Sequence, residues 1–274
     1  MNDHGTERES EKDDDGEVLP RFKGLPNITE GVENIYDHLL QRHKYHYPED
    51  GSHMAWIAPK IIVLFATGNV NKVVDAVVKD LKHPIGANLI ASVLVQEPIR
   101  QKFIKKLRMR METMDERIAN HPNFLHTLKM IKRMKCQTVH MEEFDIADKQ
   151  KKYGRMTPKS PIIVLGFPQI YLGDKPTGVI TLSSFRTLNE SVQLVERERL
   201  DFGTISIWSC KLAEGYDMIS GVPRLNNFRF NCINVPFKDD FSAWIRNSVH
   251  YEELTVLGKM KTIAFPISSP VFAS

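Results

Sequence analysis

The sequence predicts an α/β domain with a mostly parallel sheet and helices on both faces. Across residues 161–208, an apolar strand, a Gly-Asp-Lys-Pro-Thr-Gly turn, a β-branched strand, a helix and a further strand follow one another. Apolar runs of strand length alternate with amphipathic segments in most of the remaining chain after residue 56. This alternation is typical of parallel strands joined by helices, and right-handed crossovers then cover both faces of the sheet.

The strands are predicted from short apolar or alternating runs. The run Ile-Ile-Val-Leu-Phe at 61–65 is continuous, as expected for a strand buried on both faces. The segment 228–235 alternates between apolar and polar residues, which is the period of a strand. The predicted strands are 61–65, 89–95, 136–141, 162–165, 179–182, 204–208, 228–235 and 261–266.

The helices are predicted from apolar residues at helical spacing. Asn69 begins one whose apolar stripe is Val73, Val74, Val77, Val78 and Leu81. Pro98 begins a long basic helix, because proline is well tolerated in a first turn. Further helices are predicted from about Thr29 and over 123–134, 188–200, 212–220 and 241–257, and a polar, lysine-rich loop is predicted over 148–159.

The bulk composition indicates one sizeable core, or one domain with appendages. The chain has 274 residues, 42% of them hydrophobic, and its net charge of +3 is close to neutral for this length. The most basic stretch, 100–110, carries Phe103, Ile104 and Leu107 at helical spacing, which favours a solvated amphipathic helix. We therefore expect no nucleic-acid partner.

The cysteines and the amino-terminal residues indicate a cytoplasmic protein. The three cysteines, Cys136, Cys210 and Cys232, do not make a disulfide framework. No apolar run approaches the roughly 20 residues of a membrane span, and the acidic amino terminus lacks an apolar signal core. We expect no membrane association.

The first fifty residues divide into two parts. Residues 1–26 are polar and rich in acidic side chains, then in Pro and Gly, and are expected to be a disordered tail with a linker. Residues 27–50 contain the helix that begins near Thr29 and a group of histidines. No cysteine or carboxylate lies there at ligand spacing, so we expect exposed histidines rather than a metal site.

Short landmarks at 57–63, 92–97, 176–178, 200–203, 233–234, 250–254 and 261–263 follow one another along the chain. In their order and spacing, the chain from residue 53 to about 265 resembles the catalytic domain of the aldehyde dehydrogenase superfamily. The segments 92–97 and 200–203 are similar to the family's strand after the nucleophile and to its "Tyr-Gly-Leu" turn. Residues 176–178 are similar to its Glu-Glu-x-Phe-Gly-Pro loop. Residues 57–63 are similar to the family's Gly-Lys-Ser-Pro strand start, and 233–234 are similar to its "Val-x-Ile-Asn" strand. Residues 250–254 and 261–263 are similar to its carboxy-terminal helix and its closing strand.

The resemblance implies an aldehyde dehydrogenase-like catalytic domain over 51–267, followed by a tail at 268–274. It also implies that the Rossmann-type cofactor domain is missing, since fifty residues cannot build a dinucleotide fold. Residues 27–50 would be a helical remnant of the end of that domain. We therefore expect a truncated, degenerate member with no cofactor.

Members of this superfamily oxidise aldehydes with a thiolate nucleophile and a glutamate base, and both positions are degenerate here. The resemblance places the nucleophile position on Ala87 and the general-base position on His53. Alanine has no nucleophile, and its neighbours supply none. No catalytic residue is expected in this chain.

The positions that bind the cofactor in this superfamily are also occupied by other residue types here. The glutamate that holds the nicotinamide ribose aligns with Lys175, which reverses the charge, and the phenylalanine beside the nicotinamide aligns with Thr177. We expect Lys175 to be an exposed turn residue.

Three hypotheses follow from the resemblance. The first is an inactive scaffold that forms homo-oligomers, or hetero-oligomers with a full-length aldehyde dehydrogenase, through an edge strand at 261–265. The second is an active NAD(P)-dependent oxidoreductase acting on aldehydes. The third is ester hydrolysis with His53 activating water. The first hypothesis is favoured because four functional positions are lost together.

Overall fold

The computed structural model describes residues 58–82, 84, 88–143, 155–156, 159–173, 176–235 and 249–266. They belong to one unit of the chain, His46–Ser274. The expectations for 1–26, 27–50 and 268–274 lie outside the described residues.

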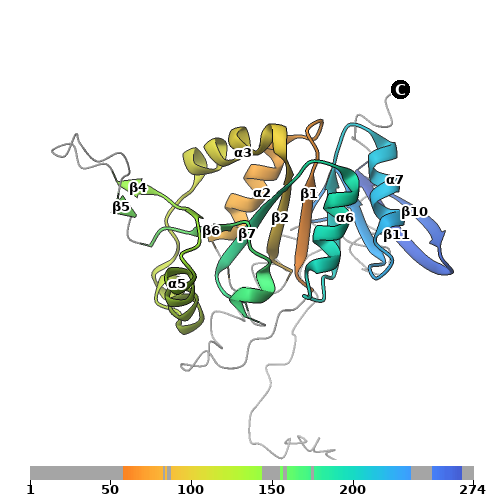
Figure 1. The fold of residues 1–274 in the computed structure, drawn as a ribbon. Helices are drawn as coiled ribbons and strands as arrows, with labels where there is room; N and C mark the ends of the chain where they lie inside the picture. Colours follow the sequence, from red (N-terminus) through yellow and green to blue (C-terminus); the bar gives the residue numbers. More distant parts are fainter. Residues whose placement is uncertain are drawn as a thin grey trace, which may run out of the picture. The chain divides into compact units, whose positions relative to one another are not determined.

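A nine-stranded sheet forms the centre of the described part of the chain (Figure 1). Its strand order is β10-β11-β9-β8-β1-β2-β7-β6-β3. The strands are β1 (Lys60–Leu64), β2 (Ile90–Gln96), β3 (Thr138–Val139), β6 (Ile162–Leu165), β7 (Val179–Phe185), β8 (Thr204–Trp208), β9 (Asn227–Phe230), β10 (Val249–Val256) and β11 (Lys259–Pro266). All neighbours from β11 to β6 pair in parallel, while β10 and β3 pair antiparallel at the two ends. The predicted mostly parallel sheet is confirmed.

Helices cover both faces of this sheet. Alternate residues of a strand point to opposite faces, and Ile62 packs with the helices α2 and α3, while its neighbour Ile61 packs with α6 and α7. On β6, Ile163 shares the face of α2 and α3, while Ile162 and Val164 pack with α5. The helices are α2 (Val70–Lys82), α3 (Glu97–Arg110), α4 (Glu116–Ala119), α5 (Pro122–Met134), η1 (Gln169–Leu172, a 3-10 turn), α6 (Leu188–Arg197) and α7 (Leu212–Gly221).

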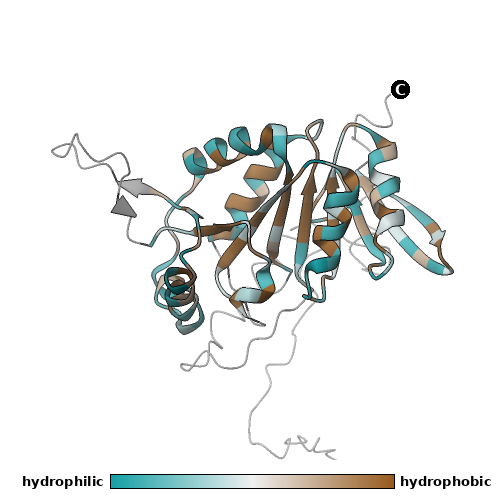
Figure 2. Ribbon diagram, viewed as in Figure 1, coloured by the Kyte–Doolittle hydropathy of each residue, from teal (hydrophilic) through white to brown (hydrophobic). Residues whose placement is uncertain are grey.

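The apolar residues of this layered arrangement face inward (Figure 2). The central strands are almost continuously hydrophobic, whereas each helix carries its apolar residues toward the sheet and its polar residues outward. This is the pattern expected when a parallel sheet is buried on both faces.

Local signals explain where the helices begin. Asn69 precedes α2, and its side-chain oxygen accepts a hydrogen bond from the backbone N–H of Lys72 at 3.1 Å. Thr187 caps α6 by accepting from the N–H of Glu190, which in turn accepts from the N–H of Arg186 at 2.7 Å. The predicted start of α2 at Asn69 is confirmed to within one residue.

The helix predicted at 241–257 is wrong over its described part. Residues 249–256 form strand β10, which pairs antiparallel with β11, while 241–248 lie outside the described residues. Leu257 and Gly258 form the turn with φ angles of 50° and 74°. Positive φ at both turn residues suits the twist of a two-residue hairpin. The helical prediction therefore missed a turn signal at Leu-Gly.

Residues 261–265 do form part of a strand, but the prediction that this strand lies at the edge of the sheet is wrong. β11 lies between β9 and β10, and β10 is the end strand. The side chains of Lys261, Ile263 and Phe265 are buried. Two strands are shorter than predicted: β3 covers only part of 136–141, and β9 ends at Phe230 because the chain then turns.

Candidate functional site

In the sequence, the four degenerate positions come before the residues that form β1, β2 and β7. These three strands are parallel neighbours, so their starts lie along one edge of the sheet, here called the amino edge. His53, Ala87 and Lys175 lie outside the described residues. Thr177 is described and stands two residues before β7.

Thr177 is a buried turn residue whose hydroxyl is fully used. It is 3% exposed, and its Oγ1 accepts from the N–H of Val179 at 3.2 Å and from the side-chain amide of Gln169 at 3.0 Å. The same hydroxyl donates to the carbonyl of Val179 at 3.2 Å. A hydroxyl offers one donor and two acceptor positions. Thr177 therefore fixes the turn before β7.

A buried carboxyl group lies behind this turn. Glu198, at the end of α6, accepts from the N–H of Gln169 at 2.8 Å. Burial raises the pKa of Glu198. The guanidinium of Arg224 donates to the backbone carbonyls of Glu198, at 2.6 Å, and of Val195. Through Gln169, Glu198 and Arg224, these hydrogen bonds connect the segment between β6 and β7 to the end of α6.

A buried lysine begins β1 at the amino edge. Lys60 is 4% exposed, and its Nζ donates to Oδ1 of Asn234 at 2.8 Å. Burial lowers the pKa of Lys60 to about 8; nearby Arg229 adds to this lowering and Asp80 opposes it. A lysine with a lowered pKa is a chemical type found in carbonyl chemistry. The sequence feature that could have indicated a buried lysine is the position of Lys60 between Pro59 and the apolar run 61–65.

We expect Lys60→Met to change how stability depends on pH. The folded pKa of this base lies below its unfolded value of 10.5, so burial of the charged form costs stability below pH 8. As pH rises above 8, the native lysine loses its proton first and the wild type regains stability. From pH 8 to 9.5 the wild type should gain about 2 kcal/mol relative to the variant.

Urea unfolding of both proteins at the two pH values measures this difference. Lys72→Met, an exposed lysine on α2, is the matched control and should leave the pH dependence unchanged. A constant difference between the wild type and Lys60→Met would show that Lys60 has an ordinary pKa.

A second polar cluster lies at the opposite, carboxyl edge of the sheet. Oγ1 of Thr67, after β1, and Oγ of Ser209, after β8, are 2.9 Å apart. Ser209 donates to a carboxylate oxygen of Glu214 at 2.5 Å, and Thr67 Oγ1 lies 3.5 Å from the same oxygen. From β1 the chain runs to β2 through α2, whereas from β8 it runs the other way to β9 through α7 on the opposite face. Ligands of open α/β sheets bind at such a switch point.

The three thiols are in different environments. Cys210 is exposed at the carboxyl edge, with its Sγ 2.9 Å from the carbonyl oxygen of Thr67. Cys232 is buried, and burial raises its pKa to about 12. Burial also raises the pKa of Cys136. Cys210 and Thr177 lie at opposite edges of the sheet, so the structure does not bring this thiol to the degenerate positions.

The described residues limit the kind of site in two respects. They contain no group of three or more His, Cys, Asp or Glu side chains arranged to hold a metal ion. Among their helices, none has both the length and the apolar character needed to span a bilayer.

An α/β domain with polar clusters at both edges of a mostly parallel sheet is thus defined. Residues 55–271 match the family described as "Protein of unknown function (DUF1487)", and because the match covers most of the chain, the protein belongs to that family. No match was found among curated proteins.

Solved structures similar to this chain include several aldehyde dehydrogenases. One is an NAD-dependent aldehyde dehydrogenase from Sinorhizobium meliloti, with 17% identity and a TM-score of 0.49 over 79% of this chain and 46% of that one. Another is lactaldehyde dehydrogenase from Escherichia coli, with 17% identity and a TM-score of 0.46 over 67% and 40%. A third, aldehyde dehydrogenase from Bartonella henselae, has 14% identity and a TM-score of 0.47 over 66% and 40%. The chain spans less than half the length of these enzymes.

Proposed function

We propose that this protein is a catalytically inactive, aldehyde dehydrogenase-like scaffold that works in the cytoplasm by binding a protein partner. The sequence resemblance supports this through four degenerate positions: Ala87, His53, Lys175 and Thr177. Oxidation of an aldehyde by this route needs a nucleophile and a base within reach of one carbonyl carbon. Thr177 stands where the resemblance places a phenylalanine, and its hydroxyl is bonded to Gln169 and Val179.

The β10–β11 hairpin is the observation that carries the proposal. As the end strand of the described sheet, β10 has a neighbouring strand on one side only within the described residues. Such an edge can pair with a strand of another chain. Figure 1 shows the hairpin extending away from the rest of the sheet.

The hairpin contacts α7 and β9, whereas apolar side chains at its tip are exposed. The hydroxyl of Tyr216 on α7 donates to Glu252 of β10, and β11 pairs with β9 through 262–264. At the tip, Leu257 is 82% exposed and Met260 is 61% exposed. Exposed apolar side chains beside an open strand edge suit a second copy of this chain or a full-length aldehyde dehydrogenase.

We expect the wild type to run as an oligomer in size-exclusion chromatography with light scattering. The double variant Leu257→Lys and Met260→Lys should weaken assembly at least about 100-fold, because each buried apolar side chain contributes about 1.5–3 kcal/mol. Met109→Lys, at a side chain on α3 that is 76% exposed, is the matched control and should assemble normally.

A wild type that stays monomeric, and that retains no full-length aldehyde dehydrogenase in a pull-down, would contradict the scaffold. Normal assembly of the double variant would contradict the role of the hairpin tip.

An active NAD(P)-dependent oxidoreductase acting on aldehydes is the alternative, favoured by the exposed thiol of Cys210 at the switch point. We expect no NADH formation with a panel of aldehydes and no change of melting temperature with NAD. Turnover by the wild type that Cys210→Ser abolishes, with Cys136→Ser as a control, would replace the scaffold proposal with this one.

A further inference from the structure

The open edge of β10 presents backbone hydrogen-bonding groups at alternate residues. Val256 of β10 pairs with Lys259 of β11 across the two-residue turn. The residues that flank such a turn exchange both backbone hydrogen bonds, and bonded and non-bonded pairs then alternate along the two strands. The residues of β10 whose backbone groups bond β11 are 250, 252, 254 and 256. Those whose groups point to the open side, where the described residues place no strand, are 251, 253 and 255.

The side chains of β10 lie on two faces with different contacts. Leu254 packs with the apolar cluster of α6 and α7, and Glu252 on the same face accepts a hydrogen bond from the hydroxyl of Tyr216. The carboxylate of Glu252 is thus bound within its own chain. On the opposite face, Thr255 lies beside Met260 of β11, which is 61% exposed.

A strand that pairs antiparallel with a second copy of itself must be complementary about one central residue, because residue i then faces j and j faces i. With the centre at Leu254, this side chain meets its own counterpart and extends the apolar cluster of α6 and α7 across the two-fold axis. Glu253 then lies opposite Thr255, and Glu252 lies opposite Val256. Each glutamate therefore faces an uncharged residue of the second copy.

The same register brings the exposed tip of the hairpin into the contact. Leu257, two residues beyond Thr255, then stands opposite Tyr251 of the second copy. Leu257 is 82% exposed in the single chain. Pairs of an aromatic and an aliphatic side chain stabilise neighbouring strands, so the tip gains cover from this register.

The neighbouring registers lack these features. A centre at Glu252 or Glu253 places that carboxylate directly opposite its counterpart, and like charges directly opposite destabilise a strand pair. A centre at Tyr251 leaves Leu257 outside the pairs made within β10, and a centre at Thr255 places Leu257 opposite Glu253. A strand that serves an unrelated partner needs no complementarity to itself, so the pattern about Leu254 favours a second copy.

We propose that β10 pairs antiparallel with β10 of a second copy of this chain, with the two-fold axis at Leu254. This inference rests on the proposed scaffold function, and it names the partner and the register. The backbone groups of Glu253 and Thr255 form the hydrogen bonds between the copies. The two Leu254 residues form a non-hydrogen-bonded pair, whose Cα atoms are about 4.5 Å apart.

Cysteine cross-linking of the full chain tests the register, in a background in which Cys136→Ser and Cys210→Ser remove the thiols that are not buried. Leu254→Cys places two thiols across the axis at a Cα separation within the roughly 4.4–6.8 Å of disulfides. Mild oxidation should convert most of this variant to a disulfide-linked dimer on a non-reducing gel. Val256→Cys, on the same face, is the matched control. Its two copies are about 14 Å apart along the strands, so it should not cross-link.

A mixture of two single variants gives a second measurement that leaves Leu254 in place. Glu252→Cys and Val256→Cys chains, distinguished by a tag on one of them, should cross-link with each other, because these residues lie directly opposite in the proposed register. Neither variant alone should form a dimer. This result does not depend on how well Leu254→Cys folds.

The outcomes separate this inference from the scaffold proposal. A disulfide in Glu252→Cys alone would move the axis to Glu252 and overturn the register. So would an oligomeric wild type in which neither Leu254→Cys nor the mixture cross-links, and the scaffold proposal would stand in both cases. A monomeric wild type that retains a full-length aldehyde dehydrogenase would overturn the self-pairing alone. A monomer that binds neither partner would contradict both proposals.

Discussion

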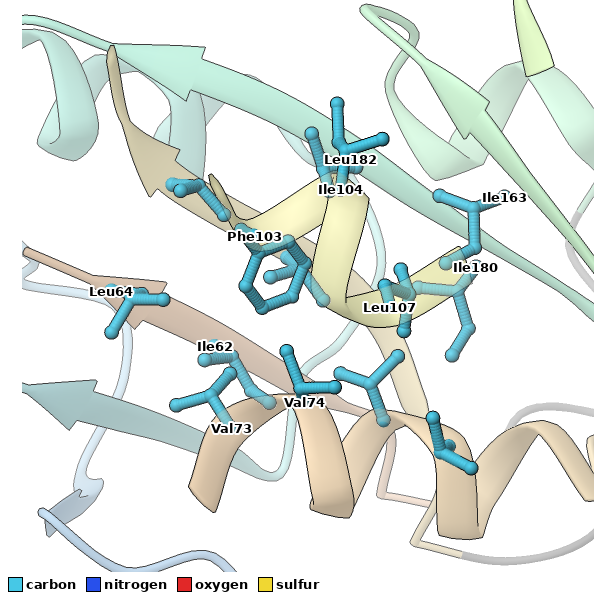
Figure 3. Packing of buried hydrophobic residues seen from close by; sticks show 14 of the residues in the cluster. Ile62, Leu64, Val73, Val74, Phe103, Ile104, Leu107, Ile163, Ile180 and Leu182 are labelled. Atoms are coloured by element: carbon cyan, nitrogen blue, oxygen red, sulfur yellow. The ribbon is translucent and has the colours of Figure 1, made fainter. Parts of the chain in front are cut away.

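Replacement of Phe103 by alanine is expected to lower the free energy of unfolding by about 3–5 kcal/mol. Phe103 is fully buried on the inner side of α3. Figure 3 shows its ring between α3, α2 and the sheet, close to Ile62, Leu64, Val73 and Val74. The alanine variant loses the transfer free energy of the ring and leaves a cavity that two helices and a sheet cannot easily close.

Urea unfolding of Phe103→Ala beside Met109→Ala gives the comparison within one helix. Met109 is 76% exposed, so its truncation should change stability by less than about 0.5 kcal/mol. Equal effects of the two substitutions would mean that α3 does not pack on the sheet as described.

Replacement of Lys261 by methionine is expected to cost about 2–4 kcal/mol. Lys261 is fully buried in β11, and its ammonium donates to the carbonyls of Val222 at 2.6 Å and Leu225 at 2.9 Å. It also lies over the ring of Phe228, 5.1 Å from the ring centre. Methionine keeps most of the length of the side chain but leaves both carbonyls without this donor.

Lys259→Met is the control for Lys261→Met, because Lys259 is exposed two residues earlier in the same strand. Chemical denaturation should give the same slope for both variants and a lower midpoint for Lys261→Met alone. A neutral result would mean that water or another donor satisfies the two carbonyls.

Of the four degenerate positions that the resemblance gives, Thr177 is the one that the described residues include. The sequence put Thr177 before a strand, and the structure confirms this and adds that its hydroxyl is fully bonded. It gave no indication that Ser209 and Glu214 would meet Thr67, because these residues are more than 140 positions apart from it. A contact of this kind depends on β1 and β8 being neighbours, and strand order is set by long-range packing.

The hairpin of β10 and β11 shows where local patterns fail. The segment 249–256 contains apolar residues at spacings compatible with a helix, and its partner strand lies only a few residues further on. Its two-residue turn, Leu257-Gly258, is a weak signal because the favoured first residue is Asn, Asp or Gly. Pairing with β11, itself anchored on β9, selects the strand.

The sequence by itself determined the alternation of strands and helices from β1 to α7, because each element buries a face whose period is visible in a short window. The resemblance, also taken from the sequence alone, places the nucleophile position of the aldehyde dehydrogenases on Ala87. Tertiary structure alone decided which strand lies at the end of the sheet, which lysines are buried, and that Ser206 lies beside Arg229. The physical reason is that burial of a charge or of a lone donor depends on groups brought together from distant parts of the chain, and no local period encodes them.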